Sequence, residues 1–269
     1  MIDLAGLGGQ GPLYALSGLL VGFIVGLTGV GGGSLMTPLL VLLFGFSPAA
    51  AVGTDLLFAA LTKAGGTVMH SLSRTIAWPV VGWLAVGSVP ATALTLLGLR
   101  SYDLHSPALS AAISLALGVA LLLTAAGLAG RRPAWTAARA LPMAPGKRAG
   151  LTILTGALLG FLVSLSSVGA GAFGLTILIL LYPERRPAVL VGTDIAHAVP
   201  LTLLAGLGHW LLGTVNWTVL AALLIGSLPG IVLGSLAAPK APERVLRGIL
   251  AAILAVVGLK LIGGSISWS

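Results

Sequence analysis

The sequence predicts an all-α polytopic membrane protein with two inverted structural repeats, each a glycine-broken helical hairpin followed by three transmembrane helices. The first observation behind this prediction is composition: the 269 residues are 57% hydrophobic and 7% charged, with a mean hydropathy of +1.11. Soluble domains carry about 25% charged residues. Apolar stretches of spanning length, about 20 residues each, run nearly end to end. Because these stretches lack the polar–apolar alternation of barrel strands, the spans are expected to be helices.

Charge and rare residue types exclude several other classes of function. The net charge is +8 and the pI is near 10.9, but the basic residues lie in short connections between apolar stretches, as the positive-inside rule expects. We therefore expect no nucleic-acid partner. The chain has no cysteine, which excludes disulfides and cysteine-ligated metal. Four histidines without clustered carboxylates, and no Ser/His/Asp spacing, predict no metal, no cofactor and no enzymatic activity.

The second observation is an internal repeat that relates the two halves of the chain. The segment AVGTDLLFAALTKAGGTVMH (51–70) matches LVGTDIAHAVPLTLLAGLGH (190–209) at an offset of 139 residues, and later tryptophan and proline positions follow the same offset. Self-similarity of this extent indicates two structural units. It predicts a first transmembrane repeat over 12–130, a basic cytoplasmic connector over 131–148, and a second transmembrane repeat over 149–262.

Each repeat is expected to contain an apolar helix, a glycine-rich break, a short apolar segment and three full spans. In chain order these segments are 12–28, 34–45, 48–70, 75–98 and 104–130, then 149–166, 172–182, 187–210, 215–238 and 243–262. Small residues spaced by four in the helix before each break predict a close-packing face against another helix. These residues are Gly18, Gly22 and Gly26, and then Gly156, Gly160 and Ser164.

The breaks TGVGGG (28–33) and SSVGAG (166–171) are candidate binding sites. Glycine inside a helix costs about 1 kcal/mol relative to alanine, and irregular backbone at membrane depth is tolerated where it is buried or lines a cavity. A helix that begins at Ser34 or Ala172 would direct free N–H groups at an anion. Alternatively, the glycines only permit close packing around a kink. The predicted substrate-binding residues are Gly31, Gly32, Gly33, Ser34, Thr54, His70, Gly169, Ala170, Gly171, Thr193 and His209.

Two aspartates lie inside predicted spans, at the same place in each repeat. An aspartate at mid-membrane costs about 2.5–3.5 kcal/mol on insertion scales, and such residues mark ion or proton pathways. Asp55 and Asp194, each in a VGTD motif, are therefore predicted to couple transport to an ion, together with Lys63 and His197 in the same spans. The alternatives are structural. The Thr-Asp pairs could cap an interrupted helix, the lysine could snorkel as an anchor, and the span-end histidines could be interfacial polar tips.

The third observation is the distribution of lysine and arginine, which discriminates between parallel and inverted halves. If the broken segment crosses once, the halves are parallel; if it folds back, as a hairpin or as two short crossings, they are inverted. With the connector cytoplasmic, inverted halves place 11 of the 14 basic residues inside, and parallel halves place only 7 there. We expect inverted repeats with both termini outside, an architecture typical of secondary transporters. The 11 residues are Arg74, Arg131, Arg132, Arg139, Lys147, Arg148, Arg185, Arg186, Lys240, Arg244 and Arg247.

These motifs together resemble the TauE/SafE family of sulfite and organosulfonate exporters, also called the toluene-sulfonate uptake permease family. The segments that carry the resemblance are GLTGVGGGSLMTPLL (26–40), the segment 51–70, and their echoes SVGAGA (167–172) and VGTD (191–194). The resemblance implies a bacterial inner-membrane carrier of two repeats that moves small anions of the sulfite, sulfonate or sulfoacetate type. The second repeat departs from the first, because SVGAG has lost a glycine and Thr202 replaces Lys63.

The predicted function is secondary transport of a small sulfur-containing anion, as an exporter coupled to protons or cations in a multi-pass protein of the inner membrane. A carboxylate close to an anionic substrate repels it unless a proton or cation neutralises it, which is the physical reason to expect coupling. The alternatives within this class are a carrier of another small anion or of a divalent cation, and an uptake permease of the same fold. A passive channel and an intramembrane enzyme are alternatives from other classes.

Overall fold

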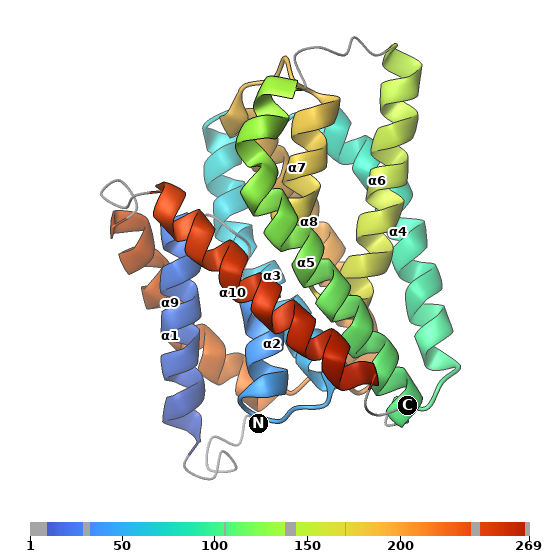
Figure 1. Ribbon diagram of the computed structural model, residues 1–269, viewed down its shortest axis with the longest axis vertical. Coiled ribbons are helices and arrows are strands. Elements are labelled where there is room, and N and C mark those ends of the chain that lie inside the picture. Colours follow the sequence, from blue (N-terminus) through green and yellow to red (C-terminus); the bar gives the residue numbers. More distant parts are fainter. Residues whose placement is uncertain are drawn as a thin grey trace.

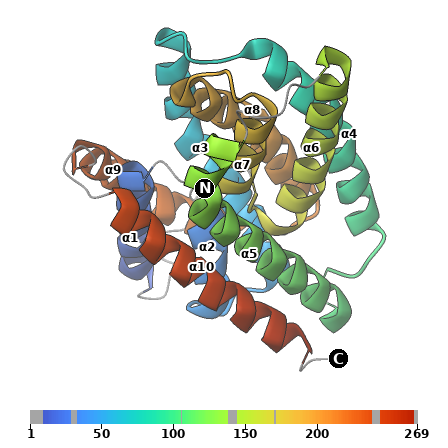
Figure 2. The ribbon, with the colours of Figure 1, turned by 45° about the horizontal axis from the view of Figure 1, so that its top comes forward.

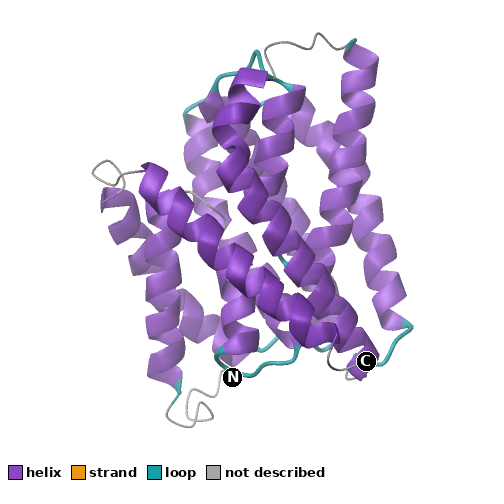
Figure 3. Cartoon of the chain, viewed as in Figure 1, coloured by secondary structure: helices purple, strands orange, loops and turns teal. Residues whose placement is uncertain are grey.

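A computed structural model of the chain describes residues 10–28, 33–104, 106–137, 144–169, 171–237 and 243–266. These residues form ten α-helices and no strand (Figure 1, Figure 3). The helices are α1 (Gly11–Thr28), α2 (Gly33–Leu42), α3 (Pro48–Leu72), α4 (Trp78–Arg100), α5 (Pro107–Ala137), α6 (Pro145–Ser166), α7 (Ala172–Leu181), α8 (Pro187–Leu211), α9 (Trp217–Ala237) and α10 (Glu243–Ile266). Six of the described helices are long and apolar enough to cross a membrane, namely α4, α5, α6, α8, α9 and α10. The expected all-α, multi-pass membrane class is confirmed.

Two of the helices are too short to span a bilayer alone. Helices α2 and α7 have 10 residues each, which corresponds to about 15 Å of rise, half the hydrocarbon thickness of a bilayer. In Figure 1, α2 lies in the lower half of the molecule and returns to the end where α1 begins, whereas α7 lies in the upper half and returns to the end where α6 begins. The chain therefore folds back after each glycine-rich segment, and the two hairpins enter from opposite ends.

The ends of the helices also separate the two sides of the molecule. In Figure 1, α1 begins and α10 ends at the lower end, whereas α5 ends and α6 begins at the upper end. The expected connector over 131–148 differs from the structure in one respect: α5 continues to Ala137 and α6 already begins at Pro145, so much of this stretch is helical. Proline is well suited to the first turn of α6 because it lacks the N–H that would stay unpaired there.

The small-residue faces before each break pack against the other half of the chain. A Cβ at Gly18 of α1 would lie 2.2 Å from the carbonyl oxygen of Leu223 in α9, and a Cβ at Gly156 of α6 would lie 2.1 Å from that of Leu84 in α4. Figures 1 and 2 show α1 beside α9 and α6 beside α4. Only glycine permits backbones this close. The close-packing faces expected from the spacing of four are confirmed, and the structure shows in addition that each packs on a helix of the opposite half.

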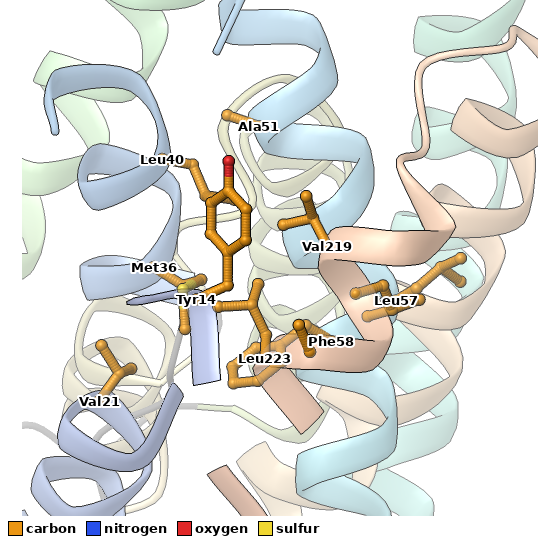
Figure 4. Close-up of a cluster of buried hydrophobic side chains, with 11 residues drawn as sticks. Tyr14, Val21, Met36, Leu40, Ala51, Leu57, Phe58, Val219 and Leu223 are labelled. Atoms are coloured by element: carbon orange, nitrogen blue, oxygen red, sulfur yellow. The ribbon is translucent and has the colours of Figure 1, made fainter. Parts of the chain in front are cut away.

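The lower hairpin is fixed by an apolar cluster in which four helices meet. Tyr14 of α1, Met36 of α2, Phe58 of α3 and Leu223 of α9 are buried together (Figure 4). The Tyr14 ring also lies 4.6 Å, between centroids, from that of Phe44 just after α2. Burial of these large side chains stabilises the contact of the hairpin with α3. The cluster thereby positions α2 against the helix that carries Asp55.

Candidate functional site

Asp55 is buried in the first third of α3 and faces the short helix α2. Its side chain has 0% exposure, and the hydroxyl of Thr37 donates a hydrogen bond to carboxylate oxygen Oδ2. The other oxygen, Oδ1, has no hydrogen-bond partner among the described residues. Buried polar atoms are almost always paired in folded proteins. Asp55 therefore offers one buried carboxylate oxygen to a proton or to a bound molecule.

Ser167 completes this half of the site from the other repeat. It follows α6 at the second break, adopts the left-handed conformation with φ of 57°, and lies near enough to Asp55 to interact with the carboxylate. Its Oγ is buried and forms no hydrogen bond within the described parts of the chain. The carboxylate of one repeat and the break of the other thus face each other in the interior.

Asp194 faces the other short helix, in the corresponding place of α8. It is 3% exposed, and a Cβ at Gly174 in the first turn of α7 would lie 2.7 Å from its Oδ1. The residue before α7 is Gly171, which has no side chain that could cap that turn. A carboxylate here lies at the positive end of the α7 dipole. Glycine at position 174 lets the carboxylate approach the helix backbone directly.

Lys63 connects the two aspartates electrostatically. It lies on α3, partly buried, and interacts electrostatically with both Asp194 and Asp55. Attraction between opposite charges is stronger in a protein interior than in water, because the effective dielectric constant is lower. The second repeat has no equivalent cation, because Thr202 occupies the matching position. The hydroxyl of Thr202 donates to the carbonyl oxygen of Ala198 within α8, with an O···O distance of 2.8 Å. The two half-sites are therefore chemically different.

His197 lies one turn after Asp194, in a buried polar contact with α4. Its Nε2 is 2.9 Å from the Oγ of Ser88, and the side chain is 1% exposed. Lys63 also acts electrostatically on this imidazole. The structure thus brings the four predicted coupling residues into one electrostatic cluster between α3 and α8. Whether they couple transport to an ion stays a prediction.

The Thr-Asp pairs do not cap the helices that carry them. Helices α3 and α8 run without interruption from Pro48 to Leu72 and from Pro187 to Leu211, so both aspartates lie inside regular helices. An N-cap residue must lie at a helix start, where N–H groups lack intrahelical partners. Neither aspartate therefore caps the helix that carries it, whereas Asp194 lies against the first turn of α7.

The threonines of the two VGTD motifs lie where the repeats meet. The backbone N–H of Ala77, just before α4, donates to Thr193 Oγ1 with an N···O distance of 2.9 Å. The backbone N–H of Asn216, just before α9, donates to Thr54 Oγ1 at 3.0 Å. Each hydroxyl accepts a hydrogen bond from the opposite half of the chain, in a reciprocal arrangement. A substrate contact by either hydroxyl stays a prediction.

The histidines at the ends of the two spans each contact a threonine just beyond their own helix. His70 Nδ1 lies 2.8 Å from Thr75 Oγ1, and His209 Nδ1 lies 2.9 Å from Thr214 Oγ1. His209 is fully buried and its Nε2 contacts the carbonyl oxygen of Ser164 at 2.9 Å, whereas His70 is only partly buried. The two histidines therefore make the same contact through Nδ1 but differ in exposure.

The residues of the breaks are described only in part. Gly31, Gly32 and Ala170 lie outside the described residues. Gly33 begins α2 and Ser34 is buried in its first turn. Gly169 and Gly171 have φ of 128° and 133°, which is backbone that favours glycine. The second break therefore needs glycine for its conformation.

Sequence reasoning missed three residues of this site, namely Thr37, Ser88 and Ser167. Each had a signal in the sequence, because Thr37 is a hydroxyl in a short apolar segment and Ser88 and Ser167 belong to repeated motifs. Their contacts depend on how the hairpins dock against α3 and α8. No pattern along the chain contains that information.

Ten helices with two hairpins that turn back beside buried carboxylates define a membrane transporter. The chain belongs to the family described as sulfite exporter TauE/SafE, which matches residues 14–261. It is 41% identical over 255 residues to the probable membrane transporter protein YjnA of Bacillus subtilis strain 168, covering 92% of this chain and 98% of the relative.

Two further relatives are more distant. A probable membrane transporter protein of Xylella fastidiosa strain Temecula1 is 29% identical, over 91% of this chain and 92% of the relative. YdhB of Bacillus subtilis is 27% identical, over 93% and 99%. No solved structure matches the chain. The resemblance expected from the motifs is confirmed, and the family is one of transporters and not of enzymes.

Proposed function

We propose that the protein is a secondary transporter that exports small sulfur-containing oxyanions, such as sulfite, sulfoacetate or other organosulfonates, across the bacterial inner membrane. One observation carries the proposal: two buried aspartates face two short interior helices, Asp55 at Thr37 of α2 and Asp194 at Gly174 of α7, with Lys63 acting on both. The half-helix starts provide N–H groups for an anion, and the family description supports the sulfite class. The proposed backbone contacts are Gly31–Ser34 and Gly169–Ala172.

Charge balance assigns different roles to the two carboxylates. An oxyanion cannot lie near an ionised Asp55 without strong repulsion in a buried site, and the hydrogen bond that this carboxylate accepts from Thr37 comes from a neutral hydroxyl. We therefore place the coupling proton on Asp55. Asp194 lies against the first turn of α7, where the positive end of the helix dipole and the nearby Lys63 offset its charge. The anion would then bind only while Asp55 carries a proton, so that anion binding depends on pH.

Counterflow into liposomes tests the proposed function. Purified protein is reconstituted, and exchange of labelled sulfite, sulfoacetate and sulfate is measured with and without a pH gradient. We expect saturable exchange of sulfite or a sulfonate that the gradient accelerates. Exchange that does not saturate would indicate a passive channel. If no anion exchanges while a divalent cation does, the substrate class is wrong.

Replacement of Thr37 by valine tests the neighbouring hydroxyl. The change keeps the shape of the side chain and removes the hydrogen bond to Asp55. We expect the pH at which counterflow is half-maximal to move, because the protonated and ionised carboxylate lose different amounts of stabilisation. Thr37→Ser, which keeps the hydroxyl, should retain the wild-type profile. Identical pH profiles for the valine and serine variants would show that the Thr37 hydroxyl does not contribute to proton coupling.

We also propose that the two repeats are inverted, with the connector cytoplasmic and both termini outside. Each hairpin returns to the end from which it entered, and the two hairpins enter from opposite ends (Figure 1). An odd number of crossings in each half follows from this. The same orientation places Arg74, Arg148, Arg185 and Arg186 on the cytoplasmic side, in agreement with the positive-inside rule.

Single-cysteine labelling tests the orientation without background, since the chain has no native cysteine. Ser101 lies exposed after α4, and Ser73 lies exposed after α3, at opposite ends of the molecule. A membrane-impermeant maleimide is expected to label Ser101→Cys in intact cells and to label Ser73→Cys only after the inner membrane is permeabilised. The reverse pattern would invert the proposed orientation, and labelling of both in intact cells would contradict it.

A further inference from the structure

A cavity lies at the lower end of the molecule in Figure 1, away from the buried aspartates. Its volume is about 710 Å³, and it is lined by the α2–α3 connection, the first turns of α5 and the last turns of α10. Figures 1 and 2 show the end of α10 beside the beginning of α5. The cavity is large enough for a small organic group and far larger than a single water molecule needs.

The polar side chains of the cavity are hydroxyls and one cation. Ser47, Ser110, Ser114 and Lys260 line it, and no aspartate or glutamate is among its described lining residues. Lys260 is exposed and lies six residues before the end of α10. A lysine at the end of a membrane helix reaches the interface with its ammonium group. The polar part of this cavity therefore favours an anionic group.

The other repeat shows that these polar residues are not required by the fold. Gly118 of α5 and Gly258 of α10 pack on each other, since a Cβ at either would lie 2.9 Å from the carbonyl oxygen of the other. This reciprocal contact sets the register that relates the two helices. The residues equivalent to Ser110, Ser114 and Lys260 in this register are Leu250, Leu254 and Ala120, all of them buried. The hydroxyls and the cation are specific to one end of the protein.

The remaining wall of the cavity is apolar and continuous with the lipid-facing surface. Leu42 and Leu261 line it, and Val256 and Leu259 on α10 beside it are 66% and 61% exposed. Large exposed apolar side chains on a membrane helix contact lipid chains. The cavity therefore combines a cationic, hydroxyl-bearing part with an apolar wall, next to a helix that carries exposed apolar side chains.

We propose that this cavity binds an anionic phospholipid. Its phosphate contacts Lys260 and the hydroxyls of Ser110 and Ser114, and part of an acyl chain lies along the apolar wall. Anionic lipids bind basic residues at the membrane surface, and the hydroxyls add hydrogen bonds to the phosphate oxygens. A zwitterionic lipid has the same chain, but its own cation competes with Lys260 for the phosphate.

Native mass spectrometry of the purified full chain with added phosphatidylglycerol or phosphatidylcholine tests this site. We expect retention of phosphatidylglycerol above phosphatidylcholine, and a loss of about fivefold in that preference in Lys260→Gln, as for one lysine near anionic lipid. Arg100→Gln removes an exposed cation at the same end and should retain the preference. Ser110→Leu with Ser114→Leu, the residues of the other repeat, should also remove it by filling the cavity.

Three results would overturn the lipid site. Equal retention of both lipids by the wild type would show no recognition of charge. An unchanged preference in Lys260→Gln, with the variant monodisperse in detergent, would place the lipid elsewhere. Inorganic phosphate that binds in the absence of lipid and depends on Lys260 would assign the cavity to a water-soluble anion.

Discussion

Replacement of Asp55 by asparagine is expected to reduce gradient-driven counterflow to the level of protein-free liposomes. The amide keeps the size of the side chain and can still accept the hydrogen bond from Thr37, but it cannot bind or release a proton. Because the residue is buried with 0% exposure, removal of its charge should leave the protein folded and inserted. Replacement of a buried ionised group by a neutral isostere removes a desolvation cost.

Asp103→Asn is the matched control, and Asp194→Asn is the comparison at the second buried aspartate. Asp103 lies exposed in the connection between α4 and α5, and its replacement should leave counterflow unchanged. Asp194→Asn leaves Lys63 without one of the two carboxylates with which it interacts, so we expect impaired anion exchange that a pH gradient still accelerates. Wild-type, gradient-driven flux in Asp55→Asn would show that Asp55 has a structural role and that the coupling proton binds elsewhere.

The membrane class, the order of the elements and the two aspartates could be predicted because each depends on a local pattern. Apolar length identifies the spans, glycine identifies the breaks, and a carboxylate inside an apolar stretch is conspicuous. The internal repeat strengthened these predictions, because a span or break identified in one half of the chain predicts the matching span or break in the other half. The helix ends were predicted less well where composition is ambiguous, as in the stretch RRPAWTA (131–137), in which arginines and a proline suggest a loop but which extends α5.

The partners of the aspartates could not be predicted, because they come from segments that meet only in three dimensions. Thr37 reaches Asp55 from a hairpin that folds back inside the protein, and Ser167 approaches it from the other repeat. The same is true of Thr54 and Thr193, for which the sequence indicates only a hydroxyl inside a span. Their hydrogen bonds to the starts of α9 and α4 depend on how the two repeats interlock.

Replacement of Gly87 by alanine is expected to destabilise the protein strongly, whereas Gly82→Ala on the same helix should not. A Cβ at Gly87 would lie 1.9 Å from the carbonyl oxygen of Ile153 in α6, but one at Gly82 would meet nothing within 4 Å. Overpacking of a core costs about 1–3 kcal/mol, occasionally more; here the obstacle is helix backbone, so we expect a cost of about 3 kcal/mol or more. At Gly82 alanine is the better helix former by about 1 kcal/mol. Thermal loss of the monodisperse peak in detergent measures the difference.

The same substitution connects packing to the functional site. Ser88, next to Gly87, contacts His197 at 2.9 Å, so a displacement of α4 from α6 should also separate the hydroxyl from the imidazole. Gly226→Ala gives the equivalent clash between α9 and α1, 1.8 Å from the carbonyl oxygen of Ala15, without changing the α4–α6 contact. We expect both variants to be destabilised, and the protein that remains folded to lose more transport in Gly87→Ala than in Gly226→Ala. Equal transport by the two folded variants would show that the Ser88–His197 contact does not contribute to transport, and wild-type stability of both would contradict the interlocked packing of the two repeats.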